Sequence, residues 1–306
     1  MSLFPPPRTI LAEVFTTLPD HFRQKPLTAD RAASGRSVPA HGCFLEGPSF
    51  DRDGNLYVTD IPFGRVFRIA PDGGWTLVAE YDGEPNGLKI HRDGRIFITD
   101  YRHGVMLLDP GSGRVTPLLE GFKAERFKGV NDLVFARNGD LYFTDQGQTG
   151  LQDPSGRVYR LRADGRLERL AHNLPSPNGL VLNGAESILY VAVTRANAVW
   201  RLPLMPDGSV LRMGLFIQLS GGRGPDGMAM DEADGLAVAH PDMGAVWVFD
   251  HRGEPRLRVQ SPRSDVVTNI AYGGPGNRTL HIVDSVAGCI LTAEVPVPGR
   301  AMFSHQ

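Results

Sequence analysis

The sequence predicts an all-β protein, a six-bladed β-propeller, from three observations. A turn that contains Asp or Asn followed by Gly recurs with an alternating apolar strand, in steps of 40 to 49 residues along the 306-residue chain. Short alternating segments are separated by glycine turns, and no segment has strong helical periodicity. A repeat of roughly 40–50 residues that holds about four short strands is typical of a propeller blade.

The clearest copies of this repeat end in Thr-Asp, at residues 51–60, 91–100 and 136–145. Weaker copies end near Thr194, His240 and Asp284. Six copies fit the chain with little left over. We therefore expect six four-stranded antiparallel blades around a central channel.

The segments between the repeats also read as strands and as closing elements. Residues 64–70 and 156–161 alternate apolar and polar side chains, as half-buried strands do. A propeller must close its ring or leave strand edges exposed. We expect residues 9–15 to form a strand that pairs with the C-terminal strands within 279–294, and the polar residues 19–40 to form a loop or lid over one face.

The predicted organisation is a single domain. Residues 1–40 would hold the closing strand and the loop, residues 41–298 the propeller, and residues 299–306 a tail. The formal net charge of −2 gives no basic face for nucleic acid. No apolar run approaches the roughly 18 residues of a membrane span, and the N-terminus lacks the apolar core of a signal peptide. We expect a cytoplasmic monomer or homodimer.

A second repeat places one polar residue just before each blade copy, usually followed by glycine and an apolar strand. The six residues are Glu46, Asn86, Asn131, Asn178, Asp226 and Asn269. The first strand of each blade lines the channel, so equivalent positions should converge at one end of it. Amide and carboxylate oxygens with two formal negative charges suit a hard divalent cation. Asn-Gly and Asp-Gly can also be plain turns, but Glu46 followed by Gly-Pro is a poor turn and favours the metal site.

These segments resemble the senescence marker protein, gluconolactonase and luciferin-regenerating enzyme superfamily, from about Phe44 to the C-terminus. The resemblance lies in residues 45–48, 131–132, 177–180 and 225–228, which occur in the order of the family motifs. It implies a six-bladed propeller that hydrolyses lactones, with one divalent cation. Ca²⁺ is the expected ion, and Mg²⁺, Mn²⁺ and Zn²⁺ are alternatives. By motif, the ligands are Glu46, Asn178, Asp226 and Asn131, and Asp226 is also the catalytic residue.

The sequence departs from two branches of this superfamily. Gly129 stands where the animal sugar lactonases have a substrate-binding Arg, with Arg126 nearby but unmatched. Ala229 and Ala271 stand where the organophosphate-hydrolysing branch has ligands for a second calcium ion, which favours one metal and disfavours that branch. Organophosphate hydrolysis is a disfavoured alternative to lactone hydrolysis. A propeller that binds a partner and uses the metal only as a structural staple is another.

The expected mechanism combines the cation with Asp226 as the general base for water that attacks a small lactone. Further candidate substrate contacts are drawn from the ring and from the loops that leave the second strands. They are Asn131, Asn86, Asn269, His103, His240 and Arg126. For His103 and His240, a packing or surface role is the competing interpretation.

Overall fold

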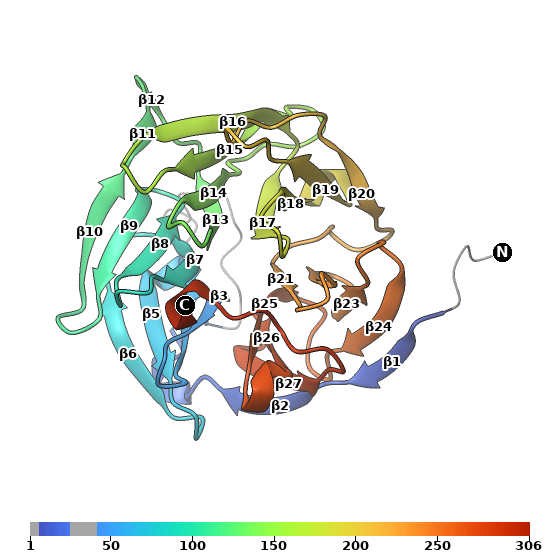
Figure 1. The fold of residues 1–306 in the computed structure, drawn as a ribbon. Coiled ribbons are helices and arrows are strands. Elements are labelled where there is room, and N and C mark those ends of the chain that lie inside the picture. Colours follow the sequence, from blue (N-terminus) through green and yellow to red (C-terminus); the bar gives the residue numbers. More distant parts are fainter. Residues whose placement is uncertain (1–5, 25–41) are drawn as a thin grey trace.

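The structure, a computed structural model, describes residues 6–24 and 42–306. Six antiparallel β-sheets are arranged as blades around a central channel, as the repeat predicts (Figure 1). The inner strand of each blade contacts the inner strands of its two neighbours, which closes the ring around the channel. The described residues contain no α-helix, and the second strands end within a residue of the predicted repeat ends.

The first three blades follow each other along the chain. Blade 1 contains β3 (Leu45–Phe50), β4 (Leu56–Asp60), β5 (Arg65–Ile69) and β6 (Trp75–Glu80). Blade 2 contains β7 (Pro85–Ile90), β8 (Ile96–Asp100), β9 (Gly104–Asp109) and β10 (Arg114–Leu119). Blade 3 contains β13 (Val130–Phe135), β14 (Leu141–Asp145), β15 (Gly156–Leu161) and β16 (Leu167–Leu174). A small hairpin of β11 (Gly121–Phe122) and β12 (Glu125–Arg126) precedes blade 3.

The last three blades include the site of ring closure. Blade 4 contains β17 (Pro177–Leu182), β18 (Ile188–Val193), β19 (Ala198–Pro203) and β20 (Gly214–Gln218). Blade 5 contains β21 (Met228–Met230), β22 (Leu236–His240), β23 (Ala245–Phe249), β24 (Pro255–Gln260) and β1 (Arg8–Leu11). Blade 6 contains β25 (Val267–Gly273), β26 (Thr279–Asp284), β27 (Cys289–Glu294) and β2 (Glu13–Thr17). Short 3₁₀ turns lie at Asp20–Phe22, Ile61–Phe63, Thr194–Ala196, Pro275–Asn277 and Phe303–His305.

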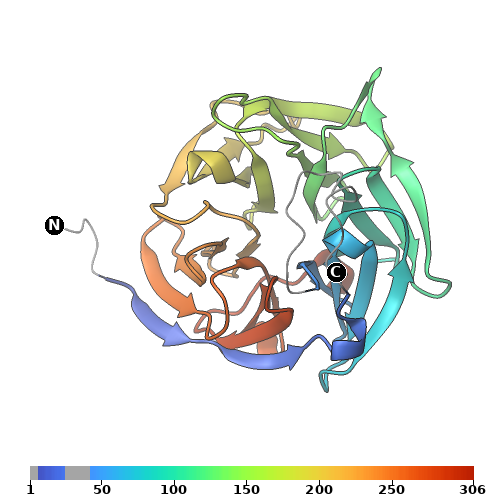
Figure 2. The same ribbon diagram turned by 180° about the vertical axis from the view of Figure 1, so that it is seen from behind.

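An N-terminal strand closes the ring as predicted, but the predicted single strand 9–15 is two strands. β2 pairs antiparallel with β27, whereas β1 pairs parallel with β24 and adds a fifth strand to blade 5. The break falls at Ala12, which is buried and whose N–H donates to the carbonyl of Gln260 at 2.9 Å. The chain therefore passes from the outer edge of one blade to the outer edge of the next, as both views show (Figures 1 and 2).

Apolar side chains from the faces of neighbouring blades fill the space between the sheets. Between blades 2 and 3, for example, Phe97, Phe135 and Phe143 belong to one buried cluster. This packing fixes the blades relative to one another, and so fixes the positions of the residues that line the channel.

The structure describes only part of the loop predicted over residues 19–40. The loop expected over residues 19–40 falls mostly on residues 25–41, which lie outside the described residues. Its described ends are anchored at the end of the channel where the inner strands begin: the carbonyl of Phe22 accepts a hydrogen bond from Arg65, and the N–H of Phe44 donates to Asp60. Across the described ranges, no helix has the length and apolar character needed to cross a bilayer.

Candidate functional site

The six polar residues of the second repeat lie together at one end of the channel, and we call them the ring residues. They are Glu46, Asn86, Asn131, Asn178, Asp226 and Asn269, each at the start of an inner strand or just before it. Asp226 is partly exposed, and the other five are only 3% to 6% exposed. Asn269 Nδ2 donates to Glu46 Oε2 at 2.8 Å, which links blade 6 to blade 1. The neighbouring inner strands therefore bring the main chain at these six positions to one end of the channel, and the hydrogen bond between Asn269 and Glu46 joins two of their side chains.

The pairing of the inner strand is irregular at the ring residue in five blades. The register between the first and second strands shifts at or beside the ring residue in blades 1, 2, 3, 4 and 6. A β-bulge commonly re-aims a side chain. The ring residues lie in or next to the inner strands and not in hairpin turns, so turn formation does not explain the repeat.

The glycine that follows most ring residues makes room for the neighbouring blade. A Cβ at Gly47, whose φ is +58°, would lie 2.4 Å from the carbonyl oxygen of Asn86. A Cβ at Gly179 would lie 2.4 Å from the carbonyl oxygen of Asp226. Any larger residue would push the blades apart at the ring.

The Thr of the Thr-Asp signature holds the ring residue of the next blade. Thr59 Oγ1 donates to the carbonyl of Asn86 at 2.6 Å. Thr99 Oγ1 donates to the carbonyl of Asn131 at 2.5 Å, and Thr144 repeats the contact one blade further on. The second strands of blades 1, 2 and 3 therefore fix the main chain of the next blade where that blade contributes a ring residue.

The Asp of the same signature acts within its own blade. Asp60, Asp100 and Asp145 accept backbone hydrogen bonds from the residues two positions before Glu46, Asn86 and Asn131, each at 2.8 Å. These carboxylates fix the chain as it enters the inner strand. The signature that marks the blades in the sequence is thus the part that positions the ring.

Asn131 is held by a hydrogen-bonded network of blades 3 and 4. Its Nδ2 donates to Gln146 Oε1 at 2.9 Å, and Gln146 Nε2 donates to Ser176 Oγ at 2.9 Å. Thr149 completes the network by donating to the carbonyl of Gln146. Because the Asn131 amide nitrogen faces Gln146, its oxygen is directed away from this network.

Asp132 is a third carboxylate at this end of the channel, and it was missed as a site residue. It is 3% exposed, and burial raises its pKa, with the charge of Lys89 opposing the shift. Its Oδ1 accepts a hydrogen bond from the N–H of Leu133. The sequence held one signal for it, because Asp132 occupies the position where four of the other segments have glycine.

The donor set fits a hard divalent cation. Burial raises the pKa of Glu46, and the nearby charge of Asp132 raises it further. Among the described residues, the carboxylate of Glu46 is met by the N–H of Gly47 and by Asn269, and no ion pair includes it. A buried carboxylate without a counter-charge is costly. A cation held by Glu46, Asp226, Asn178 and the oxygen of Asn131 would supply that charge through oxygen ligands alone.

Three further predicted contacts, His240, His103 and Arg126, lie outside the ring residues themselves. His240 is buried, and burial lowers its pKa. Its Nε2 forms a hydrogen bond with the carbonyl of Gly221, and its Nδ1 accepts one from Trp247 Nε1. His103 lies in a turn at the rim, and its Nε2 forms a hydrogen bond with the carbonyl of Asp82. Arg126 is exposed in the outlying hairpin of β11 and β12 (Figure 1).

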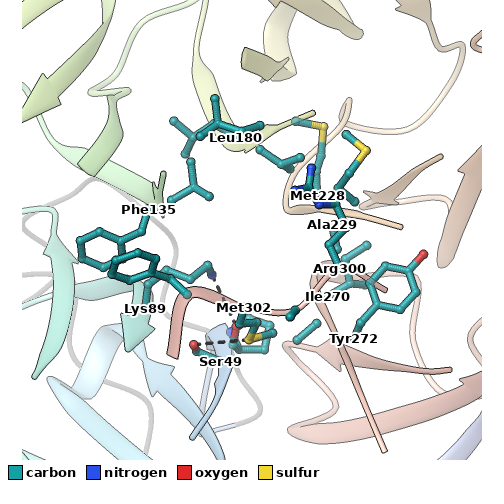
Figure 3. Close-up of a pocket in the computed structure, with 18 of the residues that line it drawn as sticks. Ser49, Lys89, Phe135, Leu180, Met228, Ala229, Ile270, Tyr272, Arg300 and Met302 are labelled. Carbon is teal, nitrogen blue, oxygen red and sulfur yellow. Dashed lines mark hydrogen bonds between the residues drawn. The ribbon is translucent and has the colours of Figure 1, made fainter. Parts of the chain in front are cut away.

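The other end of the channel is apolar and is covered by the C-terminal segment (Figure 3). A cavity of about 130 Å³ is lined there by the C-terminal halves of the inner strands. The N–H of Phe50 donates to Met302 Sδ, and Phe303 stacks on Phe135. Lys89 is a charged side chain of this lining, with Nζ donating to the carbonyl of Leu88 at 3.1 Å. Glu186 and Arg300 also line this cavity, so its largely apolar wall includes three charged side chains.

Comparisons with known proteins place the chain in a family. The model of the SMP-30/gluconolactonase/LRE-like region matches residues 44–285. Lactonase drp35 of Staphylococcus aureus strain MW2 is 32% identical over 240 residues, which cover 74% of this chain and 73% of that protein.

Solved structures with the same fold include two whose functions are described. A gluconolactonase from Xanthomonas campestris superposes with a TM-score of 0.72 at 24% identity, over 84% of this chain and 86% of that one. Regucalcin, a calcium-binding protein from Agrobacterium tumefaciens, superposes with a TM-score of 0.73 at 22% identity, over 97% and 100% of the two chains. At this identity they show the fold. The sequence matches and the propeller together establish that the chain belongs to the SMP-30, gluconolactonase and luciferin-regenerating enzyme-like family.

Proposed function

We propose that the protein is a divalent-metal-dependent lactonase whose active site is the ring at the mouth of the channel. The observation that supports this proposal is that Glu46, Asn131, Asn178 and Asp226 all lie at the start of the inner strand of their blade, or just before it, and so at the same end of the propeller. Membership of a family that includes lactonases and gluconolactonases supports the reaction class. The bound ion is a single divalent cation, with Ca²⁺ as the first candidate because all the donors are oxygen atoms.

Asp226 has the position expected of a general base. It is the ring carboxylate that is partly exposed, whereas Glu46 is buried. Asp226 accepts a proton from the attacking water, whose oxygen forms a bond to the lactone carbonyl carbon. The C–O bond of the lactone then breaks, and the proton passes from Asp226 to the leaving alkoxide oxygen of the substrate. The product is the open-chain hydroxy acid.

The remaining ring residues orient the site. The cation, when bound, supplies Lewis-acid polarisation of the carbonyl and lowers the pKa of water. Asn269 uses both ends of its amide within the ring, because Nδ2 donates to Glu46 and Oδ1 accepts from the N–H of Ile270 at 2.8 Å. We therefore assign Asn269 to positioning Glu46 and retain Asn86 as a candidate substrate contact.

The first test measures lactone hydrolysis by proton release, on chelated protein and after addition of Ca²⁺, Mg²⁺, Mn²⁺ or Zn²⁺. We expect turnover to return with one of these ions. Asp226→Asn should lower kcat by about 10²- to 10⁴-fold, the usual contribution of a general base. Asp265→Asn, the same change at an exposed position, serves as the control. Calorimetric titration with the same ions gives a readout that does not depend on activity.

The outcomes separate the alternatives. Full turnover in Asp226→Asn would refute its assignment as the base. Tight metal binding without lactone turnover would refute the lactonase proposal, and organophosphates would then be assayed at the same site. Loss of thermal stability alone on chelation, with no turnover of either class, would indicate a metal-stapled binding propeller.

A further inference from the structure

The ring of Tyr101 lies directly over Gly129, at the rim of the proposed active site. Gly129 precedes Asn131 by two residues and has a φ of +148°. A Cβ at Gly129 would lie 2.4 to 2.8 Å from three ring atoms of Tyr101. Tyr101 therefore occupies the space that a side chain at position 129 would take.

The main chain around this contact is fixed from both blades. The N–H of Gly129 donates to Asp145 Oδ1 at 2.8 Å, and its carbonyl accepts from the N–H of Gln146 at 2.9 Å. The N–H of Tyr101 donates to the carbonyl of Glu84 at 3.0 Å, two residues before the ring residue of blade 2. Tyr101 is thus tethered between the segments that lead to Asn86 and to Asn131.

The hydroxyl of Tyr101 accepts a hydrogen bond from a residue of blade 3. Gln148 Nε2 donates to Tyr101 Oη at 2.9 Å, and Gln148 is exposed in the loop after β14. This bond spans blades 2 and 3 and fixes the orientation of the aromatic ring. Tyr101 is half-buried, so part of its surface remains exposed beside Gly129.

We propose that Tyr101, held by Gln148 over Gly129, is a specificity-determining residue that favours lactones carrying a hydrocarbon substituent over polyhydroxylated lactones. An aromatic wall gains from covering apolar surface of the substrate. A hydroxylated substituent placed against it would lose water and gain no matching partner, which lowers kcat/KM. This inference rests on the proposed lactonase function and names the substrate class of the same site.

The test compares three lactones that share a six-membered ring. They are δ-valerolactone, which is unsubstituted, δ-decalactone, which carries a pentyl chain, and D-glucono-1,5-lactone, which is polyhydroxylated. Each is assayed with the wild-type protein, Tyr101→Ala, Tyr101→Phe and Gln148→Ala, after a thermal melt of each variant. We expect the wild type to have its highest kcat/KM with δ-decalactone.

The variants isolate the aromatic wall. In Tyr101→Ala, the ratio of kcat/KM for δ-decalactone to that for glucono-1,5-lactone should fall about tenfold, mainly through KM. Tyr101→Phe keeps the ring and should retain most of the ratio. Gln148→Ala, at an exposed position, should shift the ratio in the same direction by a smaller factor and gives a second measurement if Tyr101→Ala does not fold.

Two results would overturn the inference, and they differ in what else they overturn. Turnover of these lactones with the same ratio in the wild type, Tyr101→Ala and Gln148→Ala would overturn the role of Tyr101 alone. Absence of turnover of all three lactones by the metal-loaded wild type would overturn the proposed function, and this inference with it.

Discussion

His281 lies at the seam where the ring of blades closes, and acid should destabilise the protein there. It belongs to β26, and its ring makes edge contacts with Phe15 of β2 and Phe50 of β3, at centroid distances of 5.8 and 4.8 Å. Its Nδ1 is buried and has no hydrogen-bond partner in the part of the chain that the structure describes. Burial lowers the pKa of His281 from 6.5 to about 4. Protonation would therefore place a charge between the closing strand, blade 6 and blade 1.

The magnitude follows from the two pKa values. Between pH 6.5 and about 4, the unfolded chain binds a proton at this residue that the native protein does not bind. The contribution to stability is therefore retained above pH 6.5 and is lost as the pH falls through this window. Each pKa unit corresponds to about 1.4 kcal/mol. Lowering the pH from 7.5 to 5 should thus remove about 2 kcal/mol of the free energy of unfolding through His281 alone.

Urea unfolding at pH 7.5, 6 and 5 measures this effect in the wild type and in His281→Leu. We expect the loss of unfolding free energy between pH 7.5 and 5 to be about 2 kcal/mol smaller in the variant. His172→Leu, which removes an exposed histidine of β16, is the matched control and should follow the wild type. An equal loss in all three proteins would refute the assignment of this acid sensitivity to His281.

Three further perturbations test the ring and the channel. Glu46→Gln removes a buried carboxylate and should weaken divalent-cation binding at least about tenfold in calorimetry, and an unchanged affinity would exclude Glu46 as a ligand. Thr99→Val leaves the carbonyl of Asn131 without its donor and should cost about 1–3 kcal/mol in urea unfolding, with a Thr76→Val variant at an exposed strand position as comparison. Phe303→Ala removes the stack on Phe135 and should make the C-terminal residues sensitive to carboxypeptidase, as followed by mass spectrometry, and equal resistance would contradict a packed tail.

The fold and the ring were predictable because each blade repeats the same local chemistry. A glycine turn followed by an alternating strand recurs in the sequence of every blade, so the number of blades and the start of each inner strand follow from the spacing of this pattern. β1 lies outside this repeated sequence pattern. Its parallel pairing with β24 depends on which sheet edge is nearby in space, whereas the apolar character of residues 9–15 predicts one continuous strand. Ala12, where the chain changes sheets, is an ordinary residue in that pattern.

The parts of the site that escaped prediction are contacts between blades. The Thr-Asp signature was visible, but the donation from Thr99 to the next blade depends on how the sheets pack. The network around Asn131 joins Gln146 and Ser176 from different blades. His240 carried no sequence feature from which its hydrogen bonds to Gly221 and Trp247 could be predicted, because both partners depend on the packing of blade 5.

The threonine contacts mean that the blade is not the unit in which this active site can be exchanged. A graft that replaces one whole blade brings its own ring residue but leaves that residue's carbonyl to be held by a threonine of the preceding, unchanged blade. A segment that begins at the second strand of one blade and ends after the first strand of the next, such as residues 56–90, carries both members of the contact. Recombination between relatives should therefore preserve activity best when crossovers fall in the turns between the first and second strands.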